Sequence, residues 1–251
     1  MLVDAHCHLM HITHDTIENV LQRAKEAGVT AITNNGTNPE DNRISLALAK
    51  RYPQVKAALG FYPTDTLKMT DEQIGEEMVF IKKNKDDVFA LGEVGIDYHW
   101  ITDQKEQKKE RENFEKVLAF AEKIKRPVIV HSRKAEADTI DLLLSSKLKK
   151  IVMHCFGGSV KLVPTVVDAG WSFSIPTNVV RDSHFQKLTE IVPIGQLLTE
   201  TDAPFLGPEK DVPNEPANIA KAIPIIAQIK RITSAEMKNI IFYNYKRIFE
   251  P

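Results

Sequence analysis

Residues 1–9, Met1-Leu-Val-Asp-Ala-His-Cys-His-Leu9, form a short apolar run that ends in two histidines. Successive side chains of a β-strand point to opposite faces, so Asp4, His6 and His8 would share one face. Two imidazoles at this spacing, at the end of a strand, can bind one metal ion. This stretch therefore predicts a buried strand that carries metal ligands at its C-terminal end.

Seven more apolar runs of strand length follow, near 29–34, 55–60, 88–93, 127–131, 150–154, 171–175 and 196–200. Helical patterns lie between them, near 14–27, 39–51, 71–84, 104–125, 134–146, 159–169 and 183–191, with two more near 215–230 and 233–249. Nearly continuous apolar strands are typical of a parallel sheet that is buried on both faces. Eight strands that alternate with helices predict an α/β fold, a (β/α)₈ TIM barrel. An open doubly wound sheet is the alternative, but no Gly-x-Gly-x-x-Gly follows the first strand.

The length and charge of the chain narrow its organisation and its partners. Its 251 residues suit one barrel, and no linker or internal repeat interrupts them, so we predict a single domain over residues 1–251. The 33 Lys and Arg against 34 Asp and Glu give a formal net charge of −1. Proteins that hold long nucleic acids by neutralising phosphates are usually basic, so any contact with nucleic acid should be local.

Targeting signals are not visible in the sequence. No apolar run with a basic leader marks a secretory signal, and no stretch approaches the ~20 apolar residues of a membrane span. The sequence therefore predicts a cytoplasmic protein that does not enter the membrane. Nothing in it indicates an obligate protein partner.

Ligand-type residues stand at or just after the ends of five predicted strands: His6 and His8, Glu93, His131, His154 and Asp202. In a (β/α)₈ barrel the active site lies at the C-terminal ends of the strands, so these six side chains should converge. Four imidazoles and two carboxylates are more ligands than one tetrahedral zinc needs. We therefore predict two divalent ions, of Zn²⁺, Mg²⁺ or Mn²⁺, which suit mixed nitrogen and oxygen ligands.

The ligands divide into two predicted sets that share one glutamate. The first ion would be held by His6, His8, Glu93 and Asp202, and the second by Glu93, His131 and His154. Glu93 bridges because its strand lies between the two groups. Asp202 could also accept a proton from the attacking water, so Asp202 and Glu93 are the predicted catalytic residues.

Other polar residues lie close to these ligands in the sequence. Glu200 should share the face of Asp202, and Asp4 that of His6, so both are predicted to orient ligands. Arg133, two residues after a predicted ligand, could meet a phosphate, and His99 could line the substrate site. The remaining candidates at the mouth are two aromatic residues, Trp100 and Phe156. Either could stack a nucleobase or pack the loops.

Cys7 and Cys155 each stand beside a predicted histidine ligand. Two cysteines are too few for a disulfide framework. By strand alternation each should face away from the metal, so we predict that both are small core residues.

These motifs together resemble the TatD-related deoxyribonuclease family of the metal-dependent hydrolase superfamily, over essentially the whole chain. They stand here as Asp4-Ala-His-Cys-His8, Gly92-Glu-Val-Gly-Ile-Asp-Tyr98, Pro127-Val-Ile-Val-His-Ser-Arg133, His154-Cys-Phe-Gly-Gly158, Glu200-Thr-Asp-Ala-Pro204, Asn214-Glu-Pro216 and Asn244-Tyr-Lys-Arg-Ile-Phe249. The resemblance implies a (β/α)₈ barrel that binds divalent metal and hydrolyses phosphodiester bonds in DNA, often from an end. It places the metal ligands on the same six residues. The implied partner is DNA, single-stranded or at an end.

The chain departs from the family pattern at the substrate-binding rim. Tyr62 in Leu59-Gly-Phe-Tyr-Pro63 replaces a histidine that is usual there, so Tyr62 is a candidate substrate-binding residue beside Arg133 and His99. The segment 210–213 lacks the usual arginines, and Glu110 stands where a glutamine is common. None of these changes removes a ligand.

Two other functions compete with a nuclease. A metal-dependent hydrolase of the amidohydrolase type, acting on an amide, lactone or nucleobase, often bridges its metals with a carboxylated lysine on strand four. Here that strand ends in Glu93, and Ala90-Leu-Gly-Glu-Val94 contains no lysine, which favours the nuclease. A non-catalytic scaffold would require the loss of a ligand, and all six are present.

Overall fold

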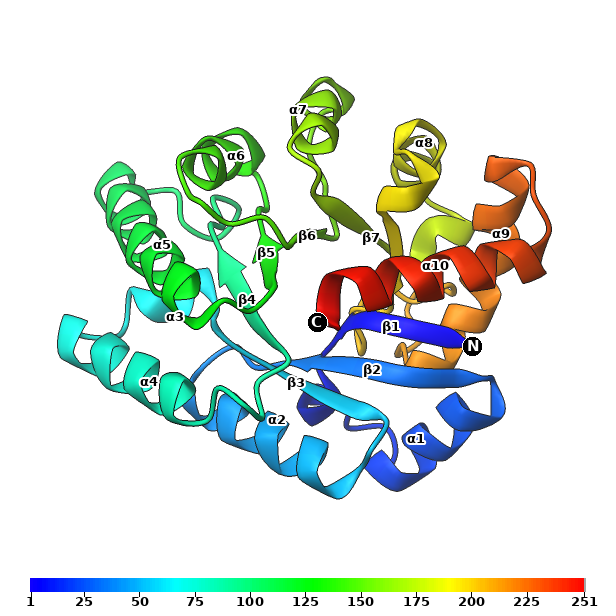
Figure 1. Cartoon of the computed structure of the whole chain (residues 1–251), viewed down its shortest axis with the longest axis horizontal. Helices are drawn as coiled ribbons and strands as arrows, with labels where there is room; N and C mark the ends of the chain where they lie inside the picture. The colour runs from blue at the N-terminus through cyan, green and yellow to red at the C-terminus, as the bar shows by residue number, and fades with distance from the viewer. Residues whose placement is uncertain (251) are drawn as a thin grey trace.

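The structure, a computed structural model, describes residues 1–250, and its core is eight parallel strands in a nearly closed barrel (Figure 1). The strands are β1 (Leu2–Cys7), β2 (Val29–Asn35), β3 (Val55–Phe61), β4 (Ala90–Gly95), β5 (Val128–His131), β6 (Ile151–His154), β7 (Ser172–Pro176) and β8 (Leu197–Glu200). Each strand pairs with the next in parallel, in the order β1 to β8. The predicted (β/α)₈ barrel is confirmed.

Helices surround the strands, as Figure 1 shows. The α-helices are α1 (Ile17–Glu26), α2 (Pro39–Arg51), α3 (Pro63–Thr66), α4 (Asp71–Lys83), α5 (Gln104–Ile124), α6 (Glu136–Leu144), α7 (Val163–Asp168), α8 (Ser183–Ile191), α9 (Ile219–Lys230) and α10 (Ser234–Phe249). The 3₁₀ turns are η1 (Leu9–His11), η2 (Val160–Leu162), η3 (Thr177–Val180), η4 (Ile194–Gln196) and η5 (Pro216–Asn218). Within residues 1–250, no helix has the length and apolar character that crossing a bilayer requires.

Two glycines allow neighbouring strands to approach β4 closely. A Cβ at Gly60, on β3, would overlap the backbone of Glu93, and a Cβ at Gly95 would overlap the backbone of His131. Gly95 also has a φ of 153°, which L side chains rarely adopt. These close contacts fix the backbone of β4 on either side of the Glu93 side chain. The two glycines therefore help to position a predicted ligand as well as to pack the sheet.

Side chains close the barrel between β8 and β1. The backbone N–H and the hydroxyl of Thr201 donate to the two carboxylate oxygens of Asp4 at 2.9 and 2.6 Å. Asp4 is fully buried, and burial raises its pKa to about 8 against these hydrogen bonds. Beyond the strands, the N–H of Asp202 donates to the carbonyl of His6 at 2.9 Å. Asp4 therefore links β1, which carries His6, to the segment after β8, which carries Asp202. Its carboxylate also accepts a hydrogen bond from the backbone N–H of His6.

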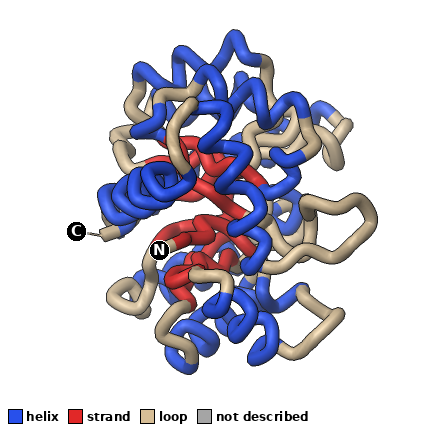
Figure 2. The backbone as a smooth tube through the Cα atoms, turned by 90° about the vertical axis from the view of Figure 1, so that its right-hand side faces the viewer, coloured by secondary structure: helices blue, strands red, loops and turns tan. Residues whose placement is uncertain are grey.

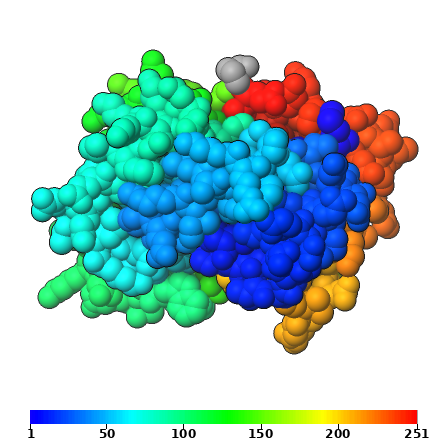
Figure 3. Space-filling view, turned by 90° about the horizontal axis from the view of Figure 1, so that it is seen from below, coloured from blue at the N-terminus to red at the C-terminus, as the bar shows by residue number. Residues whose placement is uncertain are grey.

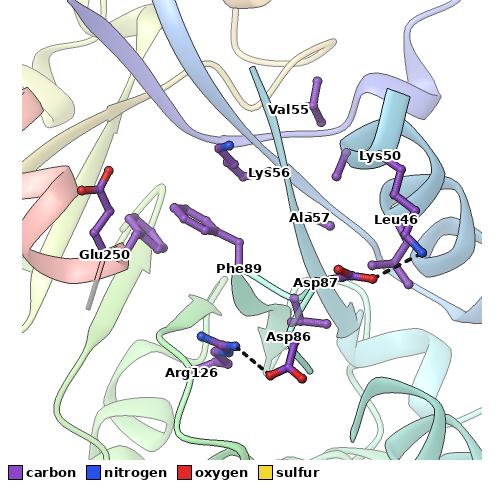
Figure 4. A pocket seen from close by; sticks show the side chains of 13 residues that line it. Leu46, Lys50, Val55, Lys56, Ala57, Asp86, Asp87, Phe89, Arg126 and Glu250 are labelled. Atoms are coloured by element: carbon purple, nitrogen blue, oxygen red, sulfur yellow. Dashed lines mark ion pairs between the residues drawn. The ribbon is translucent and has the colours of Figure 1, made fainter. Parts of the chain in front are cut away.

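The two ends of the barrel differ in character. Figure 2 shows both chain termini on one side and long loops on the other. A hollow of about 310 Å³ lies at the N-terminal ends of β3, β4 and β5, beside Phe89 and Arg126 (Figure 4). Four of its charged residues pair within it, Lys50 with Asp87 at 3.3 Å and Arg126 with Asp86 at 3.9 Å. The predicted ligands stand at the opposite end.

Candidate metal centre

The six predicted ligands converge at the C-terminal mouth of the barrel, although they come from five strands. They are His6 on β1, His8 just after β1, Glu93 on β4, His131 on β5, His154 on β6 and Asp202 after β8. Five of them are buried, and Asp202 is the most open, with 13% of its side chain exposed.

Four donor atoms form a first group with the spacing of a tetrahedral site. His6 Nε2 lies 3.5 Å from Glu93 Oε2 and 3.5 Å from Asp202 Oδ1. His8 Nε2 lies 3.3 and 3.5 Å from the same two oxygens, and the two ring nitrogens are 3.0 Å apart. Zinc bonds of ~2.0–2.2 Å in a tetrahedron put neighbouring ligand atoms roughly 3.3–3.6 Å apart. The donor set therefore fits one divalent ion at its centre.

A second group gathers around the other oxygen of Glu93. Glu93 Oε1 lies 2.6 Å from His131 Nδ1 and 3.6 Å from His154 Nε2. His154 Nε2 also lies 3.9 Å from Asp202 Oδ1. Three protein donors leave coordination positions free, as in catalytic rather than structural metal sites. The geometry can thus hold a second ion, with one oxygen of Glu93 directed at each group.

The histidines are oriented through their other ring nitrogens. A hydrogen bond at one imidazole nitrogen fixes the tautomer and leaves the other nitrogen free to bind metal. The acceptors are the Asn35 carbonyl for His8 at 2.9 Å, Asp97 Oδ2 for His131 at 2.8 Å and Glu200 Oε2 for His154 at 2.9 Å. Among the described residues, His6 Nδ1 has no such partner. Its ring instead stacks on that of His154, with centroids 3.7 Å apart.

Charge is concentrated in this cluster. Burial would raise the pKa of Glu93, but the charge of His131 and its hydrogen bonds with histidines hold it well below its usual range. Burial opposes protonation of His8, yet Asp202 and Glu93 raise its pKa to about 10. Burial and the charge of His154 together lower the pKa of His6 to about 3. The carboxylates are therefore ionised, and a divalent cation that binds here would displace the proton that they favour on His8, because only the neutral imidazole is a ligand.

Asp97 is a polar residue of the site to which the sequence analysis assigned no role. One of its carboxylate oxygens accepts from the Tyr62 hydroxyl at 2.9 Å and faces His131 Nε2 at 2.8 Å. The other accepts from the backbone N–H groups of His99 and Trp100. Burial raises and the hydrogen bond with His131 lowers the pKa of Asp97, which ends below its usual value. Asp97 thus holds His131 with its Nδ1 directed at Glu93.

Replacing Asp97 by asparagine should weaken metal binding roughly 10- to 100-fold, as for other groups that orient a ligand. The amide offers His131 either a poorer acceptor or a donor, so the preferred tautomer of His131 is lost. Isothermal titration of the stripped protein with Zn²⁺ measures the change. Asp138→Asn is the matched control, because Asp138 accepts from Tyr98 and contacts no ligand. Equal affinities in the two variants would show that Asp97 does not position His131.

Glu110, on α5, is buried next to Asp97, and only one of its two carboxyl oxygens has a hydrogen-bond partner. Its Oε1 accepts from the Asp97 N–H at 3.2 Å, whereas its Oε2 has no partner among the described residues. Burial raises the pKa of Glu110 from 4.5 to about 7. Between these pH values the folded chain keeps a proton that the unfolded chain has released. Stability should therefore fall as the pH rises through this window, by up to about 3 kcal/mol.

Glu110→Gln should remove this loss and stabilise the protein by about 1–3 kcal/mol at pH 8, with little change at pH 4.5. Urea unfolding at both pH values, with the metal concentration held constant, measures the difference. Glu112→Gln on the same helix is the control, since the side chain of Glu112 is 48% exposed. If Glu110→Gln keeps the pH dependence of the parent, the buried carboxyl group is not its source.

A cavity of about 500 Å³ opens above the donor atoms. Of the predicted substrate-binding residues, Tyr62 and Arg133 line it. His99 is exposed, and its ring lies edge-on against Trp100 with centroids 4.7 Å apart. Phe205 also lines the cavity, and the sequence analysis missed it because a phenylalanine after Ala-Pro in a loop carries no periodic signal.

The structure decides two expectations at the mouth. Phe156, which could stack a nucleobase or pack the loops, has the packing role, because it is fully buried with its ring edge-on against Phe173. Cys155 packs against the core as expected, but it also lines the cavity, so the prediction that it faces away from the metal was wrong; its φ of 42° ends the alternation of β6. Cys7, by contrast, is a buried core residue as predicted.

Comparison with known proteins gives consistent matches along the chain. A family model described as TatD related DNase matches residues 3–250. Deoxyribonuclease TATDN3 of Homo sapiens is 33% identical over 258 residues, covering 99% of this chain and 94% of the relative. An uncharacterized metal-dependent hydrolase of Methanocaldococcus jannaschii is 34% identical over 249 residues, covering 99% of this chain and 96% of that protein.

Two solved structures resemble this chain to different degrees. YJJV, a TatD homolog of Escherichia coli, superposes with a TM-score of 0.91 at 26% identity, over 100% of this chain and 98% of that one. A dihydroorotase of Campylobacter jejuni superposes with a TM-score of only 0.60 at 13% identity, over 100% and 83% of the two chains. The second likeness is one of fold alone.

Proposed function

The chain belongs to the family of TatD-related DNases, and from this membership we propose that it is a deoxyribonuclease that uses two divalent metal ions to remove nucleotides from DNA ends. As a member of this family it is a metal-dependent hydrolase. The proposed substrate is DNA, single-stranded or at an end. The proposed cofactors are two ions of Zn²⁺, Mg²⁺ or Mn²⁺, held by the two donor groups that share Glu93.

The observation that carries this proposal is the position of the two oxygens of Glu93. One lies 3.3–3.5 Å from the nitrogens of His8 and His6, and the other lies 2.6 Å from His131 Nδ1. A carboxylate that faces two donor groups in this way is what a bridged pair of ions needs. When bound, such a pair lowers the pKa of an attacking water and stabilises the charge of a phosphodiester during displacement.

The residues of the chain supply the remaining chemistry. Burial raises and the hydrogen bond with His8 lowers the pKa of Asp202, which stays below its usual value, so the carboxylate is ionised at neutral pH. It is the donor most open to the cavity, and it can therefore accept a proton from water there. Arg133, exposed at the rim, can bind a phosphate oxygen of the substrate.

The shortage of positive charge around the cavity favours attack at the ends of a DNA strand. Among the described residues that line the cavity, Arg133 is the one lysine or arginine. The whole chain carries a net charge of −1. A long track of phosphates would find few cations to neutralise it, so the site suits a terminal nucleotide better than the interior of a long strand.

The alternative, an amidohydrolase-type reaction, is less well supported. The fourth strand carries Glu93 and no lysine for a carbamate bridge, and the dihydroorotase shares only the fold. Small amides and lactones also have no phosphate for Arg133 to bind. We therefore keep the nuclease as the proposed function.

Hydrolysis of a 5′-labelled single-stranded oligonucleotide tests the proposal, with Zn²⁺, Mg²⁺ or Mn²⁺ returned to metal-stripped protein. The same sequence closed into a circle is the matched control, because it has no end. The expected result is metal-dependent cleavage of the linear strand, seen as a ladder for attack at the 3′ end or as a labelled mononucleotide for attack at the 5′ end, with the circle intact. Cleavage of both would exclude the exonucleolytic part, and cleavage of neither by metal-loaded protein would exclude the nuclease.

A further inference from the structure

Two large aromatic side chains stand exposed at the mouth of the cavity. Trp100, on the loop after β4, is 61% exposed, and Phe205, on the loop after β8, is 56% exposed. Both line the cavity that opens onto the donor atoms. Aromatic side chains that line a cavity together with a few polar groups are a usual feature of ligand-binding sites.

The two loops project from the same side of the molecule. Figure 3 shows a green segment near residue 100 and a yellow to orange segment from about residue 200 onward, both at the lower edge and set apart from each other. This is the side away from the N-terminus. Trp100 and Phe205 are therefore carried by two separate loops at the mouth.

The backbone of each aromatic residue is hydrogen-bonded to a residue of the candidate metal centre or to one that orients a ligand there. The N–H of Trp100 donates to Asp97 Oδ1 at 3.2 Å, and Asp97 orients His131. The N–H of Phe205 donates to the carbonyl of Asp202 at 2.8 Å, and the side chain of Asn214 donates to the carbonyl of Phe205 at 2.8 Å. The backbone of both aromatic residues is thus held in place relative to the predicted ligands.

The side chain of Arg133 lies over the ring of Trp100. The guanidinium carbon of Arg133 lies 5.6 Å from the centroid of the Trp100 ring. An arginine at this distance gains from the ring and keeps its N–H groups free for an anion. An aromatic surface beside a single cation, next to a phosphodiester-cleaving centre, matches a nucleobase with its own phosphate.

We propose that Trp100 and Phe205 form the two walls of a subsite that binds the terminal nucleobase of the DNA strand, with Arg133 on the adjoining phosphate. The inference rests on the proposed function and adds to it the part of the substrate that the rim recognises. Every base has a flat aromatic face, so stacking here tolerates any sequence. A base paired within a duplex presents no free faces, so the subsite selects single-stranded or frayed ends.

Fluorescence gives a direct test of binding, because the chain has only two tryptophans. Trp100 is exposed, whereas Trp171 is 3% exposed. Thymidine 5′-monophosphate added to the Zn²⁺-loaded protein should quench the emission, and 2-deoxyribose 5-phosphate, which has the phosphate but no base, should not. Trp100→Phe should abolish the quenching. Equal quenching by the two ligands, or quenching that survives in Trp100→Phe, would overturn the subsite.

Kinetics give the second test, with substrates that differ only at the terminal residue. Trp100→Ala and Phe205→Ala should each raise KM for a single-stranded oligonucleotide roughly 5- to 150-fold, with kcat nearly unchanged. For an oligonucleotide with an abasic terminal residue, the parent should already show the higher KM. Tyr243→Ala is the matched control, since Tyr243 is an aromatic residue 68% exposed on α10. Variants that behave as the control would overturn the proposal.

The two tests separate the subsite from the proposed function. If the parent cleaves no oligonucleotide with any metal, the nuclease is wrong, and the quenching titration alone decides whether a base binds at Trp100. If the parent cleaves normal and abasic ends equally well, the nuclease stands and the subsite falls.

Discussion

Replacing Glu93 by glutamine should lower hydrolysis at least ~10³-fold and reduce bound metal from two ions per chain to one or none. The ions supply several kcal/mol of transition-state stabilisation, and each ~1.4 kcal/mol is a factor of ten in rate. Glutamine has nearly the shape of glutamate, but only one of its two terminal atoms can bind a cation. Since the two oxygens of Glu93 face different donor groups, one group must lose its ligand.

Metal content by atomic emission spectroscopy, together with hydrolysis of the labelled oligonucleotide, measures both effects. Glu136→Gln is the matched control, because Glu136 lines the same cavity but belongs to neither donor group. It should keep both ions and most of the activity. If Glu93→Gln binds two ions as the parent does, Glu93 is not a bridging ligand, and the assignment of the two donor groups is wrong.

The ends of the strands explain why so much of the site could be predicted from the sequence. His131 and His154 each end a four-residue strand whose first three residues are apolar, and parallel strands in a barrel all end at one mouth. Local sequence therefore fixed the position of these side chains once the strands were recognised. Glu200, predicted to orient a ligand, lies 2.9 Å from His154 because both stand at the ends of their strands.

Residues that act across elements were harder to predict. Asp97 reaches His131 from the loop after β4, and Glu110 reaches Asp97 from α5, so their roles depend on packing between segments. Phe205 and Cys155 owe their positions to irregular backbone after a strand, where period-two alternation has ended. Pattern analysis describes regular elements and says little about the turns that follow them.

Helix boundaries show the same limit on a smaller scale. The predicted helix 159–169 is a 3₁₀ turn followed by α7, and Pro164 stands in the first turn of α7, where a missing N–H costs nothing. The single turns α3, η1, η3 and η4 were not predicted, because three or four residues are too few to show a periodic pattern. None of these differences moves a ligand.

Asp202→Asn should reduce kcat at least ~10²-fold while KM changes little, because the side chain has two functions that the amide cannot both perform. Its Oδ1 lies 3.5 Å from both His6 and His8, so it can complete the first donor group. Asparagine keeps an oxygen in that place and should retain part of the metal. It cannot accept a proton from water at neutral pH, so the proton-transfer contribution is lost.

The pH dependence distinguishes the two functions of Asp202. A general base is active only when it is ionised, so the activity of the parent should rise with pH through the pKa of Asp202 and then level off. In Asp202→Asn this acid limb should disappear, even in protein fully loaded with metal. Because the pKa of Asp202 lies below its usual value, activity and metal content are measured together from about pH 2 to 8 to give both quantities. A variant that holds both ions and keeps near-normal turnover would show that Asp202 is neither the base nor a required ligand, and the proton acceptor would have to be another group at the mouth.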